Sequence, residues 1–279
     1  MPEPLDFIKT ISRQETHIMQ NRILPRLVHA YVHLELPLDK AQELARKTIE
    51  TCTLDKPMDH IEQQIFSLLK KNGAFTVFDQ KMSLRALMWY QKIEPFIIGK
   101  NFLDLGGGDG RTAKRIKDEL KLEGKSVDIH VADILDYPDR ARDLPFTMMT
   151  GTNTSFKDNQ FDTVFLGTVY HHCGKELDDP LKLVEESIRV TKKRLLVIES
   201  LYEDPKERLY NMWIDWFYNR VLHFSRNPRE KVNVPFNFRK RQDWEKQFIK
   251  RKMKIIKSID LRTFQTLNPE HHWLFVLEK

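Results

Sequence analysis

The sequence is poor in cysteine and has no long hydrophobic run. Its two cysteines, Cys52 and Cys173, stand far apart, and neither belongs to a CxxC motif or to a Cys/His pattern with metal-ligand spacing. This pattern argues against a disulfide framework and predicts no metal site. No stretch approaches the roughly 18 apolar residues of a membrane span, and the first residues lack the basic segment and apolar run of a secretory signal. We therefore expect a cytoplasmic protein without a transmembrane segment.

Charge is present but unevenly placed. The chain has 279 residues, is 41% apolar and 31% charged, and has a net charge of +6, which is typical of a folded globular protein with one large or two modest domains. Residues 226–257 hold twelve Lys or Arg against three acids. This basic stretch could contact phosphate, RNA or an anionic membrane. However, Trp244, Phe248, Ile249 and Met253 recur within it at helical spacing, which favours a helix with one buried face and solvated charges.

The pattern of apolar residues changes near residue 80. Before it, apolar residues recur at helical spacing, in a series over 5–34 and in predicted helices over 39–50 and 59–69. After it, short apolar strands alternate with helices. Predicted helices cover 83–97, 111–122 and 180–190, and predicted strands cover 101–105, 127–131, 146–149, 161–166, 194–199, 254–258 and 273–277. Such alternation implies a parallel sheet covered on both faces. We predict an α/β fold, with a Rossmann-like doubly wound, mostly parallel sheet in residues 81–279 and a helical N-terminal extension in residues 1–80.

A glycine-rich turn follows the first predicted strand. Glycines permit positive φ and let a ligand approach the backbone, and the helix that follows presents free N–H groups. A dinucleotide fingerprint, G-x-G-x-x-G, counted from Gly106 needs its third glycine at position 111, which is Arg111. No Walker lysine follows either. The spacing is instead Asp104-x-Gly106-x-Gly108-x-Gly110.

This spacing resembles motif I of the class I methyltransferases, E/D-x-G-x-G-x-G. Later segments resemble the "type 11" branch of that family and come in its order, over roughly residues 83–200. These segments are Val131-Ala132-Asp133, residues 150–164 (TGTNTSFKDNQFDTV) and residues 166–172 (LGTVYHH). The resemblance implies S-adenosylmethionine as the cofactor and methyl transfer as the reaction. The cofactor-binding residues expected on this basis are Asp104, Leu105, Gly106, Gly107, Gly108, Gly110, Asp133, Ile134, Thr150, Gly151, Thr152 and Gly167.

Three polar positions in this region carry different expectations. The carboxylate of Asp133, at the end of a strand, can accept hydrogen bonds from both ribose hydroxyls of a nucleoside. Thr150 stands where the family usually has an aspartate facing the adenine amino group, and threonine offers one uncharged acceptor oxygen. Cofactor binding could therefore be weaker, or Thr152 or Asn153 could make this contact. Asp162, directly after Phe161, is interpreted as structural.

Three candidate catalytic residues, Tyr170, His171 and His172, follow the predicted strand over 161–166. A base is needed only where the methyl acceptor must lose a proton, and histidine can serve as one near neutral pH. Two interpretations stay open, a base at either histidine or a packing role on the cofactor or a loop. Residues 166–170 lack the (D/N)-P-P-(Y/F) motif of methyltransferases that act on exocyclic amines of nucleobases, which disfavours amino-base methylation.

The region 201–238 is rich in aromatic residues. Trp213, Trp216, Phe217 and Val221 lie on one side of a predicted helix, and the resemblance implies that this region forms a substrate lid, with ordinary core packing as the alternative. We predict methyl transfer to a small-molecule or lipid-like acceptor. The alternatives are an RNA or protein methyltransferase that uses residues 226–257, with RNA disfavoured, and a non-catalytic S-adenosylmethionine-binding regulatory module. The sequence indicates neither the accepting atom nor the oligomeric state.

Overall fold

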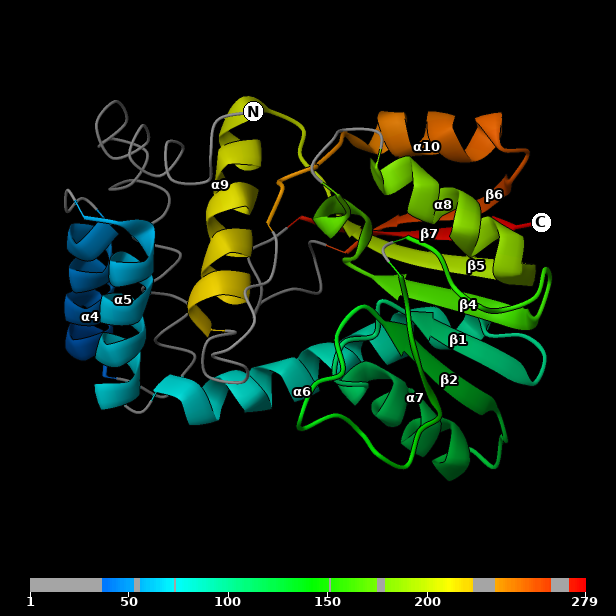
Figure 1. The fold of residues 1–279 in the computed structure, drawn as a ribbon, viewed down its shortest axis with the longest axis horizontal. Helices are drawn as coiled ribbons and strands as arrows, with labels where there is room; N and C mark the ends of the chain where they lie inside the picture. Colours follow the sequence, from blue (N-terminus) through cyan, green and yellow to red (C-terminus); the bar gives the residue numbers. More distant parts are fainter. Residues whose placement is uncertain are drawn as a thin grey trace. The chain divides into compact units, whose positions relative to one another are not determined.

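A computed structural model describes residues 37–52, 56–72, 74–150, 152–174, 179–222, 234–261 and 271–279. The chain divides into two compact units (Figure 1). The smaller unit takes its described residues from Met1–Met82 and Pro205–Val234. The larger unit takes them from Ser83–Asp204, Pro235–Gln265 and Glu270–Lys279. The predicted apolar series over 5–34 lies outside the described residues.

The smaller unit is helical where it is described. Its elements are α4 (Leu38–Cys52), α5 (Met58–Lys71), the first part of α6 (Ala74–Ile93), α9 (Pro205–Trp216) and the π-helix η4 (Phe217–Leu222). The helices predicted over 39–50 and 59–69 are therefore present. In α9 and η4, the ring of Trp213 stacks on that of Phe217 with a centroid distance of 5.3 Å. The four residues predicted to share one side of a helix are all buried: Trp213, Trp216, Phe217 and Val221. Buried Glu62 accepts a hydrogen bond from Nε1 of Trp216 at 3.1 Å. The substrate-lid hypothesis for this region stays a prediction.

The larger unit is built on one seven-stranded sheet. Its strands are β1 (Asn101–Leu105), β2 (Asp128–Asp133), β3 (Phe146–Met148), β4 (Phe161–Gly167), β5 (Thr191–Ser200), β6 (Lys254–Asp260) and β7 (His272–Glu278). Their order is β3-β2-β1-β4-β5-β7-β6. The first five strands pair in parallel, and β7 is antiparallel to both β5 and β6. The predicted doubly wound, mostly parallel sheet is confirmed. Because the strand order reverses between β1 and β4, the carboxyl ends of these two strands meet where such folds bind ligands.

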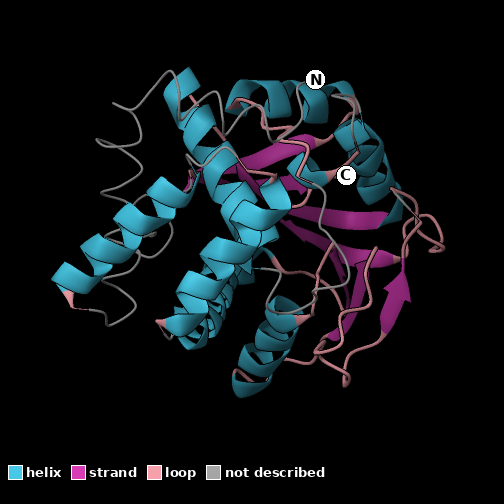
Figure 2. Cartoon of the chain, turned by 60° about the vertical axis from the view of Figure 1, so that its left-hand side comes forward, coloured by secondary structure: helices cyan, strands magenta, loops and turns pink. Residues whose placement is uncertain are grey.

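Side chains that alternate along each strand fill two cores, one on each face of the sheet. Leu103 of β1 and Val164 of β4 belong to one core, together with residues of α8 (Asp179–Val190) and α10 (Arg241–Lys250). Phe102 and Phe165 belong to the other core, together with residues of α6 and α7 (Arg111–Leu122). Figure 1 shows α8 and α10 on one face and α7 on the other, and Figure 2 shows the strands between the helices. Two-sided burial explains the uninterrupted apolar segments within these strands, residues 164–166 of β4 and 195–198 of β5.

Two predictions about helices differ from the structure. The helix expected over 83–97 begins at Ala74 and ends at Ile93, where a 3-10 turn, η2 (Glu94–Phe96), takes over, because Pro95 opposes helical geometry in the residue before it. In α10, Trp244 and Phe248 are buried, but Ile249 is 62% exposed, so its predicted burial was wrong. Each helical residue turns the side chain by about 100°, which carries position 249 off the face that 244 and 248 share.

The amino end of β4 is fixed by Asp162. Its Oδ2 accepts hydrogen bonds from the backbone N–H groups of Lys100 and Asn101 at 3.0 and 3.2 Å. These hydrogen bonds hold the pKa of the Asp162 carboxyl below its usual value. A Cβ on Gly99, whose φ is 75°, would overlap the Asp162 side chain. The structural interpretation of Asp162 is confirmed.

Among the described helices, none is both long and apolar enough to cross a lipid bilayer.

Candidate active site

The glycine loop, residues 105–110, turns the chain from β1 into α7. Gly106, Gly108 and Gly110 have φ values of 77°, 57° and 74°, a region that residues with a Cβ rarely adopt. The backbone N–H of Gly106 donates to the carbonyl oxygen of Ala132 at 2.7 Å. The loop is therefore joined to the carboxyl end of β2.

The glycines of this loop are required for different reasons. A Cβ on Gly106 would lie 2.5 Å from Cγ1 of Val169, and one on Gly107 would lie 2.7 Å from Oδ2 of Asp104. At Gly108, by contrast, the nearest atom would be Cε2 of Tyr137 at 4.0 Å. The protein itself fills the space beside Gly106 and Gly107, whereas the space beside Gly108 is open to a ligand.

Three carboxyl groups converge on this loop. Oδ2 of Asp133 accepts a hydrogen bond from the N–H of Gly108 at 2.7 Å, and Oδ1 accepts one from the N–H of Leu135 at 3.1 Å. Oδ2 of Asp104 is buried and has no hydrogen-bond partner. Burial, together with the smaller effect of the charges of Asp133 and Asp109, raises the pKa of Asp104 to about 7. Burial also raises the pKa of Asp133, while hydrogen bonds from the backbone oppose this effect.

This arrangement fits S-adenosylmethionine. Two buried carboxyl groups, those of Asp104 and Asp133, favour a positively charged ligand, because a cation relieves the cost of ionising them in a buried place. S-adenosylmethionine carries a sulfonium and an ammonium group. The unpartnered oxygen of Asp104 and the open space at Gly108 are the two features that such a ligand would complete.

The remaining predicted cofactor residues are placed unevenly around this loop. Ile134 directly follows Asp133 and is 53% exposed, which is unusual for a large apolar side chain. Leu105 is fully buried in the sheet core. Gly167, at the end of β4, leaves room for the ring of Trp89, because a Cβ there would lie 2.5 Å from Cζ3 of that ring. Packing alone is thus sufficient to explain the residue types at positions 105 and 167.

The chain after β3 forms a tight turn. Thr150 and Asn153 exchange two backbone hydrogen bonds of 3.1 Å each, and Thr150 is exposed. Thr152 is half-buried within this turn, and Gly151 lies outside the described residues. The backbone N–H of Met149 donates to the carbonyl oxygen of Asp133 at 2.8 Å, so the turn starts beside the carboxylate expected to bind ribose.

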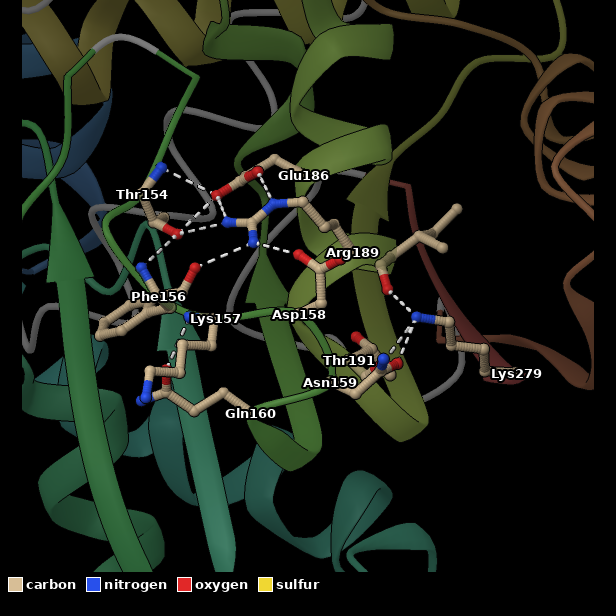
Figure 3. Close-up of polar contacts among 11 residues, drawn as sticks. Thr154, Phe156, Lys157, Asp158, Asn159, Gln160, Glu186, Arg189, Thr191 and Lys279 are labelled. Atoms are coloured by element: carbon tan, nitrogen blue, oxygen red, sulfur yellow. Dashed lines mark hydrogen bonds and ion pairs between the residues drawn. The ribbon is translucent and has the colours of Figure 1, made fainter.

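A polar clamp holds the segment that follows this turn (Figure 3). Oε1 of Glu186 accepts a hydrogen bond from the N–H of Thr154 at 2.8 Å. Arg189, one helical turn further along α8, donates to both carboxylate oxygens of Glu186 at 2.7 Å. It also donates to the carbonyl oxygen of Phe156 at 2.9 Å and to Oδ1 of Asp158 at 2.7 Å. None of these residues is among the predicted site residues, although the i,i+3 spacing of Glu186 and Arg189 indicates a pair on one helix face.

Tyr170 and the two histidines form a 3-10 turn, η3 (Tyr170–His172), after β4. The hydroxyl of Tyr170 is fully buried and lies 2.8 Å from Oγ of Ser187 in α8. Its ring lies 5.2 Å from that of Trp244 in α10. Burial raises the pKa of this phenol. The hydroxyl group therefore lies in the core between sheet and helices, where it stabilises η3.

His171 contacts a buried carboxylate. Its Nδ1 is hydrogen-bonded to Oε1 of Glu199, which lies near the end of β5. Its ring stacks on Phe238 at 4.6 Å and lies 4.2 Å from the ring of His172. Glu199 and Phe238 are not among the predicted site residues. An acid that ends an apolar strand is the signal in the sequence that indicates Glu199.

The residue before Val169 is backbone-strained. Thr168 has a φ of 59°, and its N–H donates to the carbonyl oxygen of Ile198 at 2.7 Å. Non-glycine residues in this conformation cluster at functional sites, where the surrounding structure enforces them. Here the strain turns the chain sharply from β4 into η3, so that the histidines follow directly at the carboxyl end of the sheet.

Comparison with known proteins finds one matching family model. Residues 103–198 match a family model described as a methyltransferase domain. No curated protein sequence matches the chain significantly.

Several solved structures have a similar fold. A SAM-dependent methyltransferase from Aquifex aeolicus is 14% identical with a TM-score of 0.46, over 68% of this chain and 88% of that one. YcgJ from Bacillus subtilis is 18% identical with a TM-score of 0.44, over 69% and 96%. The 1,6-didemethyltoxoflavin-N1-methyltransferase from Burkholderia thailandensis is 12% identical with a TM-score of 0.49, over 81% and 93%. These values are too low to support any conclusion about the substrate.

The matched residues run from within β1 to within β5 and so include both the glycine loop and the turn that carries the histidines. The cofactor of this family is S-adenosylmethionine, in agreement with the acidic, open setting of Gly108. Residues 103–198 of the chain are therefore similar to the methyltransferase domain of the S-adenosylmethionine-dependent methyltransferases, in their type 11 branch.

Proposed function

We propose that the protein transfers the methyl group of S-adenosylmethionine to a small-molecule or lipid-like acceptor. The observation that carries this proposal is the unpartnered, buried oxygen of Asp104 beside a glycine loop with open space at Gly108. A buried polar atom without a partner is costly, and a cationic cofactor would remove that cost. S-adenosylmethionine supplies an already activated methyl group, so the protein contributes mainly binding and orientation.

In this proposal the predicted residues bind different parts of the cofactor. Asp133 accepts hydrogen bonds from the ribose hydroxyls, with the lone pairs left by its two backbone contacts. Ile134, exposed beside it, contacts the adenine ring. The turn that begins at Thr150 faces the edge of the adenine, and Thr152 belongs to the same turn. The glycine loop lies along the methionine part of the cofactor.

A small acceptor is favoured over RNA by the state of the basic stretch. Where residues 226–257 are described, α10 packs onto the sheet through Trp244 and Phe248. Arg241 forms an ion pair with Glu245 at 3.0 Å, and Arg251 forms one with Glu185 at 2.8 Å. These features support a solvated helix face. The absence of paired prolines after β4 argues against exocyclic amines of nucleobases as the acceptor.

The first experiment measures cofactor binding. We expect S-adenosylhomocysteine to raise the melting temperature of the wild type, and Asp104→Ala to abolish this rise. Asp118→Ala is the control, because Asp118 is an exposed aspartate of α7. If S-adenosylhomocysteine gives no shift, and Asp104→Ala behaves like the control, the cofactor assignment is wrong.

The second experiment identifies the acceptor class. The protein is incubated with S-adenosylmethionine labelled in its methyl group and with fractions of a cell extract. We expect label in the small-molecule or lipid fraction. Label in a ribonuclease-sensitive fraction, reduced by the charge reversals Lys250→Glu and Arg251→Glu, would favour the RNA alternative. Cofactor binding without transfer to any fraction would favour a non-catalytic regulatory module.

A further inference from the structure

The end of α10 and the turn after it carry positive charge that nearby acids do not balance. Residues 246–257 contain five lysines, one arginine and no acidic residue. Three of these lysines are exposed, and none of the three forms an ion pair with a described residue: Lys246, Lys250 and Lys252. Ile249 lies among them and is 62% exposed. Lys246, Ile249 and Lys250 are spaced i, i+3 and i+4, so they share one face of the helix. These four residues are called the lysine surface below.

We propose that the lysine surface binds to a membrane that contains anionic phospholipids. This inference goes beyond methyl transfer and does not depend on it. The negative potential of such a membrane attracts lysine ammonium groups that lie close to it. An exposed apolar side chain between the lysines can enter the boundary between headgroups and acyl chains, while the long lysine stems let the charges stay at the headgroups. The lysine surface contains both of these components.

The helix that carries the lysine surface is held firmly from its other side. Trp244 and Phe248 are fully buried in the core of the sheet. Arg251, which follows α10, donates to Oε1 of Gln247 at 2.8 Å and to Oε1 of Glu185 in α8 at 2.8 Å. Figure 1 shows α8 and α10 together on one face of the sheet. The surface is therefore formed before any partner arrives, and binding costs little ordering of the chain.

The lysine surface lacks the groups with which proteins most often bind single-stranded RNA. Such proteins use exposed aromatic rings that stack on the bases, and arginines whose planar fork matches a phosphate. Both aromatic residues of α10, Trp244 and Phe248, are buried. Arg241 and Arg251 form ion pairs with acidic residues of the chain itself. Lysines, which act as point charges, and one isoleucine remain, and this combination favours a lipid surface over RNA.

Lys252 adds a second observation, because its backbone is strained. Its φ is 63°. Its N–H donates to the carbonyl oxygen of Ile249 at 2.9 Å, and the N–H of Met253 donates to that of Phe248 at 3.1 Å. This pattern ends a helix with one left-handed residue, which is usually glycine because a Cβ is disfavoured there. A lysine gains from the helix dipole at this end, so its role is decided only by measuring stability and membrane binding together.

The first test uses the full chain and two kinds of vesicle. One kind contains equal amounts of phosphatidylcholine and phosphatidylserine, and the other contains phosphatidylcholine alone. We expect co-sedimentation with the anionic vesicles only, weakened by salt. Replacing Lys246 and Lys250 together, Lys246→Gln with Lys250→Gln, should weaken this binding at least tenfold, at about fivefold for each lysine.

The matched control replaces two lysines with the same spacing on α7, which covers the other face of the sheet (Figure 1). This variant, Lys117→Gln with Lys121→Gln, should bind the anionic vesicles as the wild type does. The melting temperature of each variant shows that it is folded. If the wild type does not distinguish the two kinds of vesicle, or if both double variants bind equally well, the proposal is overturned. Methyl transfer and cofactor binding are unaffected by that result.

The second test separates a membrane from RNA. Ile249→Ser removes the exposed apolar side chain and leaves every charge in place, so it should weaken vesicle binding by about fivefold. It should leave any binding of polyuridylic acid unchanged. If the wild type binds polyuridylic acid more tightly than the anionic vesicles, and Ile249→Ser binds the vesicles as the wild type does, the surface is a nucleic-acid site and the proposal is wrong.

The third test addresses the strain at Lys252. Lys252→Gly removes a charge and relieves the left-handed backbone, so it should raise the melting temperature while weakening vesicle binding by about fivefold. This combination would support a lysine that is kept for the membrane at the expense of stability. A lower melting temperature with unchanged vesicle binding would mean that Lys252 serves only the end of the helix, and would contradict its place in the lysine surface.

Discussion

The side chain of Val169 occupies the space that Gly106 leaves, so that a Cβ on Gly106 would lie 2.5 Å from Cγ1 of Val169. Gly106 belongs to the glycine loop after β1, and Val169 belongs to the chain between β4 and η3. The two segments are 63 residues apart in the sequence and meet because β1 and β4 are adjacent parallel strands. The shape of the proposed cofactor loop and the position of the histidine turn therefore depend on one another.

Gly106→Ala should be more destabilising than the same change at Gly124. Both glycines have a left-handed backbone, with φ values of 77° and 73°, and alanine in that conformation costs about 1–2 kcal/mol. A Cβ at position 124 meets nothing within 4 Å, whereas at position 106 it overlaps Val169. Overpacking of this kind adds roughly 1–3 kcal/mol. Denaturant unfolding of the two variants measures the difference, and equal destabilisation would contradict the packing argument.

Asp133→Asn should weaken cofactor binding, and Asp162→Asn should not. Both aspartates accept two backbone hydrogen bonds, Asp133 from Gly108 and Leu135, and Asp162 from Lys100 and Asn101. Only Asp133 lies at the carboxyl end of its strand, beside the glycine loop. Asp162→Asn should lose stability, by about 1–3 kcal/mol, because its backbone hydrogen bonds favour the ionised carboxylate.

Calorimetric titration with S-adenosylhomocysteine separates the two aspartates. We expect at least a tenfold rise in Kd for Asp133→Asn, because Asn replaces one acceptor oxygen with a donor, and less than a twofold change for Asp162→Asn. Similar affinities in the two variants would mean that Asp133 acts only on the loop and does not touch the ligand.

The sheet and the glycine loop were predictable because their signals are local. A strand that is buried on both faces of the sheet contains a short apolar run in its sequence. The loop is defined by the spacing of glycines within residues 104–110. The partnership of His171 with Glu199 spans 28 residues and depends on the register between β4 and β5, which no local pattern encodes. The exposure of Ile249 was missed for a related reason, since helical spacing alone does not say where the buried face ends.

Tyr170→Phe should reduce stability and leave methyl transfer intact. The hydroxyl of Tyr170 lies 2.8 Å from Oγ of Ser187, which in turn donates to the carbonyl oxygen of Val184 at 2.7 Å. Loss of one buried hydrogen bond costs about 0.5–1.5 kcal/mol. Ser187→Ala removes the same bond from the other side, so the double variant should cost less than the sum of the two. A large loss of methyl transfer at full cofactor affinity would instead support a catalytic role for Tyr170.

Arg189→Lys should loosen the segment after the Thr150 turn. The guanidinium group bridges Glu186, Asp158 and the carbonyl oxygen of Phe156 at once (Figure 3), and a lysine ammonium has no planar fork with which to do so. We expect faster amide hydrogen exchange over residues 154–159 and a two- to tenfold weaker binding of S-adenosylhomocysteine. The control is Arg251→Lys, because Arg251 forms an ion pair with Glu185, and Glu185 also lies on α8. Unchanged exchange in Arg189→Lys would show that other contacts hold this segment.

The pKa of Asp104 makes both stability and cofactor binding depend on pH. Burial and repulsion from Asp133 and Asp109 together raise this pKa to about 7, while an unfolded aspartate ionises near pH 4. The folded state thus holds a proton that the unfolded state has lost. The stability that this proton provides is complete below about pH 4 and is lost as the pH rises to about 7. Over this window the wild type should lose on the order of 4 kcal/mol relative to Asp104→Asn, in which position 104 cannot ionise.

Binding of S-adenosylmethionine should show the opposite trend. Ionised Asp104 attracts the positive charges of the ligand, so the affinity of the wild type should rise between about pH 6 and pH 8. Asp104→Asn should be the more stable protein above about pH 7 but should bind more weakly and without this rise. Calorimetric titration across this range measures the affinity. The same titration with S-adenosylhomocysteine, whose sulfur is uncharged, separates the contribution of the sulfonium charge. If stability and affinity vary with pH in the same way in the wild type and in Asp104→Asn, Asp104 does not titrate in this range. The buried oxygen of Asp104 would then have a partner other than the cofactor.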